Sequence, residues 1–301
     1  MKQAIGKVIS INRGDNFANT SIYLEGNVHF NVKLNVGDEK KLEIGKVYVF
    51  ELEPYKREED TNYKAISFSL LEKSNLDKNE KDRLLNIFYD HAPISLTKIK
   101  EEIENYLNKI ENKILKDITN YVYLKYKAEF YLHPAATKFH HAYVGGLSYH
   151  TYTMLKIAEN MLEIYPFLNK DLLYSGTILH DVSKVNEMTG VDGEYTKEGM
   201  LIGHLVMGAI EVEEAALKLN VSDSEEALLL KHLIISHHGL LNFGSPKKPQ
   251  IGEALMLWYI DTIDSKFTEL GENLKRLKDG EFTESIGVLD RMRFYKPKLK
   301  K

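Results

Sequence analysis

The sequence contains no cysteine among its 301 residues. Disulfide bonds and thiolate metal sites are therefore excluded, and any metal ion must be held by histidine, aspartate or glutamate. The lack of cysteine also fits a reducing compartment, so we expect a soluble, cytoplasmic protein. No run approaches the ~18–20 consecutive apolar residues of a membrane span. The N-terminal residues lack the apolar core of a signal peptide, and we expect no association with a membrane.

A strong excess of one charge is also missing, because the formal net charge is −4. This small net charge argues against a generally basic coat for nucleic acid, but it does not exclude a local basic groove. Hydrophobic residues make up 43% of the chain, which is enough for a sizeable core. A chain of this length accommodates one large domain and a smaller one.

Residues 1–73 have the pattern of a small β-domain. Short alternating runs at 7–11, 21–24, 28–32, 47–52 and 65–70 are separated by turns rich in Gly, Asn and Asp. Five strands in about seventy residues are typical of a closed barrel, and an OB-fold is the obvious candidate. Such barrels often bind single-stranded nucleic acid by aromatic stacking. Four aromatic residues can form either that stacking face or, as we prefer for most of them, the barrel core: Phe17, Tyr23, Phe30 and Tyr48.

From residue 74 onward the pattern is helical. Residues 74–128 are highly charged, with apolar residues at near-helical spacing over 99–125, and we expect a helical linker or packing region. Residues 129–285 predict an all-α helical bundle. Residues 286–301 form a basic tail, interpreted equally as a frayed, solvated end or a phosphate-binding arm. The expected fold is α+β and multidomain, with an OB-like barrel followed by a helical bundle.

Five successive helices of the bundle each direct histidine or aspartate toward their apolar side. They are expected at 147–162, 171–185, 199–219, 222–238 and 249–270, the fourth opening with a capping box of Ser222 and Glu225. One histidine on an apolar stripe is usually a hydrogen-bonded core residue. Buried ionisable groups are costly unless they are paired or coordinated, so a set on five helices favours metal binding. The set is His150, His180, Asp181, His204, His237, His238 and Asp261.

The number of ligands suggests two divalent metal ions. One site can be formed by His150, His180, Asp181 and Asp261, and the other by His204, His237 and His238, with Asp181 bridging. Two cations ~3.5–4 Å apart lower the pKa of a shared water and stabilise both oxygens of a phosphate displacement. Lys184, one turn along, is placed to neutralise phosphate charge or to steady the attacking hydroxide. Asp264 is interpreted either as a partner that orients a ligand histidine or as a surface residue.

This order of motifs resembles the HD-domain superfamily of metal-dependent phosphohydrolases, most closely the YhaM-type 3′–5′ exoribonucleases. The resemblance extends over residues 130–264. It rests on the ligand order above, on the segments 134–136 and 140–147, on His180-Asp181-Val182-Ser183-Lys184, and on His237-His238-Gly239.

The resemblance implies an OB-fold joined to an HD domain, homo-oligomerisation and release of nucleoside 5′-monophosphates from the 3′ end of single-stranded RNA. Single-stranded DNA is a further candidate substrate. The implied cofactor is a pair of Mn²⁺ ions, with iron, cobalt or zinc as alternatives. His140 and His141 can face the substrate, and Lys247 and Lys248 either hold the RNA backbone or lie in a solvated loop.

Two other functions compete with the exoribonuclease. The first is an HD phosphohydrolase acting on a small nucleotide or a cyclic nucleotide. No Gly-Tyr-Pro follows His238, which speaks against a cyclic-di-GMP hydrolase. The second is a non-catalytic RNA-binding or scaffold protein, which the complete ligand set disfavours.

Overall fold

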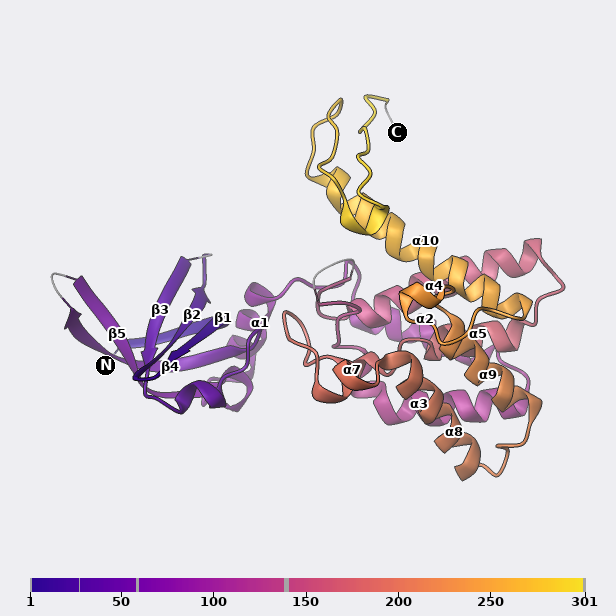
Figure 1. Cartoon of the computed structure of the whole chain (residues 1–301), viewed down its shortest axis with the longest axis horizontal. Coiled ribbons are helices and arrows are strands. Elements are labelled where there is room, and N and C mark those ends of the chain that lie inside the picture. The colour runs from indigo at the N-terminus through magenta and orange to yellow at the C-terminus, as the bar shows by residue number, and fades with distance from the viewer. Residues whose placement is uncertain (1, 27, 58–59, 138–140, 300–301) are drawn as a thin grey trace. The chain divides into compact units, whose positions relative to one another are not determined.

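The computed structural model describes residues 2–26, 28–57, 60–137 and 141–299 and divides the chain into two compact units (Figure 1). Unit 1 comprises Met1–His91 with Thr189–Glu194, and unit 2 comprises Ala92–Met188 with Tyr195–Lys301. Unit 1 contains the β-barrel and unit 2 the helical bundle, which confirms the predicted α+β class. Within the described ranges, no helix is both long enough and apolar enough to cross a membrane.

Unit 1 is built on a closed barrel with the strand order β1-β2-β3-β5-β4. Alternate side chains of each strand fill its interior, as the period of two in the sequence predicts. The observed strands extend beyond the predicted ones because polar residues such as Asn12 and Asn19 continue the pairing. The elements are β1 (Lys2–Gly14), β2 (Phe17–Leu24), β3 (Val28–Leu34), η1 (Asp38–Lys41), β4 (Val47–Arg57), β5 (Asp60–Leu70) and η2 (Leu71–Lys73).

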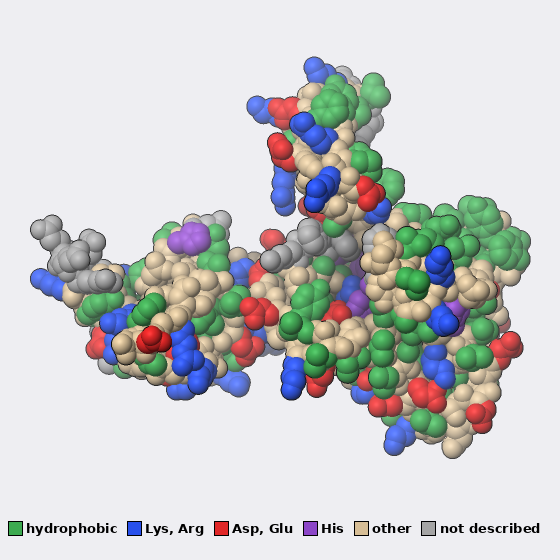
Figure 2. Space-filling view, viewed as in Figure 1, with side chains coloured by type: hydrophobic (Ala, Val, Ile, Leu, Met, Phe, Trp, Pro, Cys, Tyr) green, Lys and Arg blue, Asp and Glu red, His purple; other side chains and the backbone are tan. Residues whose placement is uncertain are grey.

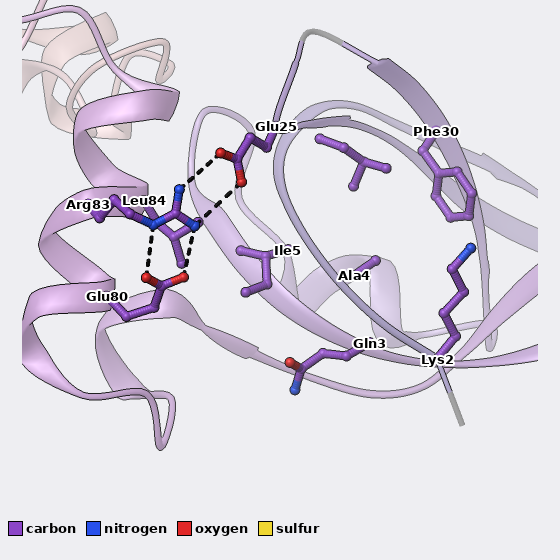
Figure 3. Close-up of a pocket in the computed structure, with 10 residues that line it drawn as sticks. Lys2, Gln3, Ala4, Ile5, Glu25, Phe30, Glu80, Arg83 and Leu84 are labelled. Atoms are coloured by element: carbon purple, nitrogen blue, oxygen red, sulfur yellow. Dashed lines mark hydrogen bonds and ion pairs between the residues drawn. The ribbon is translucent and has the colours of Figure 1, made fainter.

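Helix α1 (Lys78–Phe88) belongs to unit 1 and packs on the barrel. Its first turn is capped by Asp77, whose side chain accepts a hydrogen bond from the backbone of Glu80 at 3.0 Å. On its barrel-facing side, Leu84 is buried in a small cluster with residues of β4. Arg83 pairs with Glu80 in the same helix and with Glu25 in the turn after β2, at 2.9 Å (Figure 3). The helix is therefore fixed to the barrel by both apolar and charged contacts.

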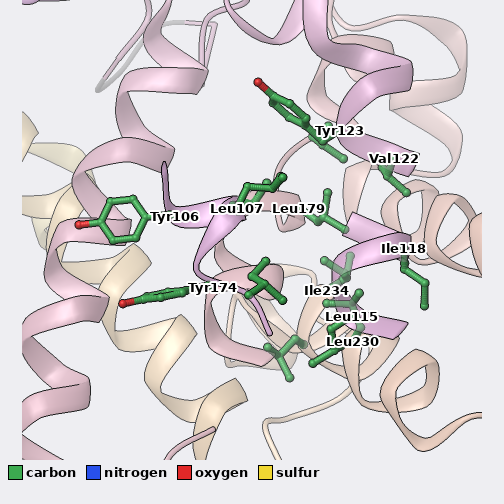
Figure 4. Packing of buried hydrophobic residues seen from close by; sticks show 14 of the residues in the cluster. Tyr106, Leu107, Leu115, Ile118, Val122, Tyr123, Tyr174, Leu179, Leu230 and Ile234 are labelled. Atoms are coloured by element: carbon green, nitrogen blue, oxygen red, sulfur yellow. The ribbon is translucent and has the colours of Figure 1, made fainter. Parts of the chain in front are cut away.

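Most helices of unit 2 share one core (Figure 4). The predicted helix over 99–125 is in fact two helices, because Asn112 caps a new helix by accepting from the backbone of Leu115 at 3.0 Å. Residues Ile103, Ile118 and Val122 of this region are fully buried in the bundle core. The elements are α2 (Leu96–Asn108), α3 (Lys113–Phe130), α4 (Gly146–Ile164), α5 (Lys170–Leu179), α6 (Lys184–Glu187), α7 (Lys197–Leu201), α8 (His204–Lys218), α9 (Glu225–Ser236), η3 (Leu241–Phe243) and α10 (Gly252–Lys275).

Two predicted helices of the bundle need correction. The helix expected over 171–185 ends at Leu179 and resumes at Lys184, with a turn between. The capping box of Ser222 and Glu225 does not form. Ser224 caps α9 instead, accepting from the backbone of Ala227 at 3.2 Å while its hydroxyl donates to the carbonyl of Val221.

The end of the chain folds into a paired arm beyond α10 (Figure 1). Bridges join Phe282 to Tyr295 and Ile286 to Met292, and the tip holds the short helix η4 (Gly287–Leu289). Residues 292–296 are thus paired with residues 280–286, unlike the frayed end that was one interpretation of the sequence. Figure 2 shows basic and acidic side chains interspersed over the visible surface, in keeping with the small net charge.

Candidate metal centre

The turn between α5 and α6 carries the doublet around which the candidate centre is built. Helix α5 ends at Leu179, and the backbone N–H of His180 still donates to the carbonyl of Gly176 at 2.8 Å. The chain then leaves the α-helix, and both His180 and Asp181 are almost completely buried. Two consecutive polar side chains are therefore held inside the bundle.

Asp181 lies among four histidine side chains. Its Oδ2 is 3.2 Å from Nε2 of His180 and 3.8 Å from Nε2 of His150. Its Oδ1 is 3.3 Å from Nε2 of His204 and 3.5 Å from Nε2 of His237. Each carboxylate oxygen thus faces a different pair of histidines, which is the arrangement required of a carboxylate that bridges two sites.

The opposite ring nitrogen of each histidine has a partner that sets its tautomer. Nδ1 of His180 donates to the carbonyl of Thr177 at 2.8 Å, and Nδ1 of His237 donates to that of Ile234 at 2.7 Å. Nδ1 of His204 lies 2.9 Å from the Glu187 carboxylate. Because carbonyl and carboxylate oxygens accept hydrogen bonds, the proton sits on Nδ1. The lone pair of Nε2 is left to face Asp181, as in metal-ligating histidines.

Several buried polar atoms of the cluster have no hydrogen-bond partner within the described part of the chain, and they show whether metal ions fit here. Among the described residues, these atoms include Nε2 of His180, His204 and His237 and Oδ1 of Asp181. Nε2 of His204 and Nε2 of His237 lie 3.3 and 3.5 Å from this Oδ1, but the contacts do not satisfy hydrogen-bond geometry. Buried polar atoms are costly when unpaired, and four of them that converge are satisfied together by cations. Imidazole and carboxylate are suitable donors for divalent first-row metals, so the residues fit.

Two further predicted ligands flank this cluster. His238 is half-buried, and its ligand atom lies within 4.8 Å of those of His204 and His237. Asp261, on α10, places Oδ1 at 3.2 Å from Nε2 of His150. The structure therefore gathers all seven predicted ligands around one place, with His150, His180 and Asp261 on one side of Asp181 and the other three histidines on the other.

The electrostatics of the cluster favour neutral histidines on one side and a cation on the other. Burial lowers the pKa of His204 and His237, and lowers that of His238 to about 4. Burial also works to lower the pKa of His150, but Asp261 and Asp264 more than offset it and raise this pKa to about 10. The two carboxylates thus stabilise positive charge at His150. A bound divalent ion would supply that charge in place of the proton.

Lys184 completes the charge pattern. Its Nζ lies 2.7 Å from Oδ2 of Asp181. Burial raises the pKa of Asp181, but the ammonium of Lys184 and the ring of His180 hold it well below its usual range. Burial in turn lowers the pKa of Lys184, and Asp181 overcomes this and raises it. A half-buried cation therefore stands beside the bridging carboxylate, where an anionic substrate would gain from it.

The predicted substrate-binding residues that the structure describes differ in their exposure to solvent. His140 lies outside the described residues. His141 is buried, with both ring nitrogens in hydrogen bonds, instead of lying open to a substrate. Lys247 and Lys248 are exposed in the loop before α10. Asp264 accepts from Nδ1 of His150 at 2.7 Å, the orienting contact that was one of its two interpretations.

Glu187 was missed by the sequence analysis. It is buried at the end of α6 and accepts from both the backbone and the ring of His204. No local sequence pattern indicated this role, because the contact depends on the packing of α6 against α8.

Comparison with known proteins places this centre within a family model described as the HD domain, which matches residues 147–265. The 3′–5′ exoribonuclease YhaM of Bacillus subtilis (strain 168) is 44% identical over 211 residues, which cover 70% of this chain and 67% of that protein. The protein of the same name from Bacillus pumilus is 44% identical over 221 residues, covering 73% and 70%. That from Shouchella clausii is 43% identical over 218 residues, covering 72% and 68%.

Proposed function

The chain belongs to the YhaM family of 3′–5′ exoribonucleases, and we propose that it shortens single-stranded RNA from the 3′ end by hydrolysis at a centre of two divalent ions. The products would be nucleoside 5′-monophosphates. The single observation that carries this proposal is the Asp181 carboxylate, whose two oxygens face separate pairs of histidines. Such a carboxylate can be shared between two cations.

The chain's own residues have distinct parts in this chemistry. When bound, two divalent ions would supply an activated water and stabilise the charge of the displaced phosphate oxygens. His150, His180 and Asp261 would hold one ion, and His204, His237 and His238 the other, with Asp181 shared. Lys184 adds a fixed positive charge 2.7 Å from Asp181 and would stabilise the phosphodiester as negative charge builds up on it.

We propose Mn²⁺ as the working metal, with Fe²⁺, Co²⁺ and Zn²⁺ as alternatives. A donor set of imidazoles and carboxylates without thiolate suits all four ions. Carboxylate and water oxygens are ligands that suit Mn²⁺ in particular.

We further propose that the barrel holds the RNA strand upstream of the scissile bond. A groove of about 810 Å³ on unit 1 is lined by Phe17, Lys33, Tyr55 and Tyr63, together with several asparagines. Phe17 is 50% exposed, and the Lys33 ammonium lies 5.2 Å from the centre of the Tyr55 ring. Exposed aromatic rings stack on bases, and the lysine can pair with a phosphate. Single-stranded DNA would meet the same groove and is a second candidate substrate.

Self-association is supported by one face of α10. Leu255, Tyr259, Ile263 and Phe267 follow one another at intervals of four residues and are 39–68% exposed. Extended apolar stripes are uncommon on monomeric surfaces, and we propose that a second copy of the chain covers this one. Light scattering should give a mass above 34.7 kDa, and F267E should reduce it. A wild-type monomer would contradict this part of the proposal.

Digestion of 5′-labelled single-stranded RNA with Mn²⁺ tests the activity directly. We expect a ladder that shortens stepwise from the 3′ end, no cleavage with a chelator, and no cleavage by D181N. Intact RNA beside rapid hydrolysis of mononucleotides or cyclic nucleotides would instead support a small-nucleotide phosphohydrolase. A parallel series with DNA of the same sequence establishes the sugar preference.

A further inference from the structure

A chain of hydrogen bonds leads from the loop before α4 to His150. His141 is 1% exposed as a residue, and its Nε2 lies 2.8 Å from Oδ2 of Asp264. Its Nδ1 lies 2.7 Å from the hydroxyl of Tyr143. The same Oδ2 of Asp264 lies 2.7 Å from Nδ1 of His150. Four side chains are therefore connected in series.

The chemistry of these groups sets the direction of every hydrogen bond. An ionised carboxylate can only accept, so both Nε2 of His141 and Nδ1 of His150 must carry protons. A neutral His141 then accepts from the Tyr143 hydroxyl at Nδ1. When a metal ion takes the place of the second ring proton, Nε2 of His150 presents its lone pair at a position 3.2 Å from Asp261 and 3.8 Å from Asp181. The series thus selects the tautomer of His150 that can bind a metal.

The backbone holds His141 in this position. Its carbonyl accepts from the backbone of Ala135 at 3.1 Å, and its φ of 56° lies in the left-handed region that non-glycine residues rarely adopt. A Cβ on Gly146 would approach that carbonyl oxygen to 1.9 Å, so the first residue of α4 must be glycine. His150 is one turn further along the same helix. The loop and the ligand are therefore tied together by both backbone packing and Asp264.

We propose that His141 is a positioning residue that acts through Asp264 to orient His150 for metal binding. The inference rests on the proposed function, because it assumes that His150 is a ligand. Without the Nε2–H donor of His141, Asp264 has one partner fewer and can rotate, and the ring of His150 loses its fixed orientation. Removing such an outer partner typically lowers metal affinity about 10–100-fold.

The test is calorimetric titration of Mn²⁺ into wild-type protein, H141L and H141Q. Leucine fills a similar volume without a donor, whereas the glutamine amide can reach Asp264 as Nε2 does. We expect H141L to lower the affinity for one of the two Mn²⁺ ions by about 10–100-fold. H141Q should keep much of the wild-type affinity. The melting temperature of the metal-free proteins serves as the measure of a purely structural role. If H141L does not fold, H141M takes its place as the variant without a donor.

The outcomes separate this inference from the proposed function. Wild-type protein that binds no divalent ion would overturn both. Wild-type protein that binds two ions, with a folded H141L or H141M variant of equal affinity, would overturn only the role of His141. Equal losses of Mn²⁺ affinity in the donor-free variant and in H141Q would also overturn this role, because the missing N–H donor would then not explain the loss.

Discussion

Glu187 holds His204 by two hydrogen bonds, one from the backbone N–H at 3.0 Å and one from Nδ1 at 2.9 Å. The backbone contact satisfies one of the free N–H groups at the start of α8, and the ring contact leaves Nε2 directed at Asp181. A single carboxylate thus fixes both the start of α8 and the orientation of the His204 ring. His150 receives the equivalent support from Asp264 on the other side of Asp181.

Replacing Glu187 should therefore weaken metal binding selectively. We expect E187A to lower the affinity of one of the two Mn²⁺ ions about 10–100-fold, and E187Q to lose less, because its amide oxygen can still accept from Nδ1. Calorimetric titration measures both events. Two ions bound by E187A with wild-type affinity would show that His204 needs no such support.

Lys184 should be required for turnover more than for folding. K184M removes the cation beside Asp181, and we expect kcat to fall about 10²–10³-fold, the usual loss for one electrostatic contact to the transition state. K170M is the matched control, since Lys170 pairs with Glu111 at 2.9 Å on the surface. K170M should leave kcat unchanged and should lower the free energy of unfolding by less than ~1 kcal/mol. A K184M enzyme with wild-type kcat would remove Lys184 from the mechanism.

Two helical glycines should respond oppositely to alanine. A Cβ on Gly271 meets nothing within 4 Å, so G271A should stabilise the fold by about 0.5–1 kcal/mol through helix propensity. A Cβ on Gly208 would lie 2.8 Å from Cγ2 of Ile234, which is fully buried and stiff because it is β-branched. G208A should therefore destabilise by about 1–3 kcal/mol. Denaturant unfolding compares the two, and equal stabilisation would show that α8 and α9 are not closely packed there.

The groove on the barrel should contribute to RNA affinity without taking part in hydrolysis. Y55A and F17A should each weaken binding of a long single strand by about 1–3 kcal/mol. Hydrolysis of a small chromogenic phosphodiester should be unaffected. Tyr48 is unsuitable for the same test because it is buried in the barrel core. Unchanged RNA affinity in both variants would assign the barrel another purpose.

The sequence indicated which histidines and aspartates converge inside the bundle, because each lies on an apolar stripe whose helical period already implies burial. His150, His180 and His204 needed no knowledge of the tertiary structure for this reason. The turn at His180 could not be predicted from the sequence, because the apolar spacing continues through Val182 into α6. Nor did the pattern show which oxygen of Asp181 faces which histidine, because that depends on how the helices pack.

The supporting residues were harder to predict. Glu187 has no local signal, because its role arises only where α6 meets α8. His141 was interpreted as a residue that can face the substrate, because it lies in a loop just before the first candidate ligand, but the structure buries it against Asp264. In the barrel, Tyr55 was not singled out, whereas Tyr48 was named both as a stacking candidate and as core. The alternation of strands gives the inner face, but it does not reveal which outer residues line a groove.

The number of metal ions bound per chain tests the central claim most directly. Titration of metal-free protein with Mn²⁺, checked by elemental analysis, should give two ions for the wild type. D181N should lose both high-affinity events, because the shared carboxylate faces both groups of histidines. One ion per wild-type chain, or two ions bound equally well by D181N, would contradict the account of Asp181 as the bridge.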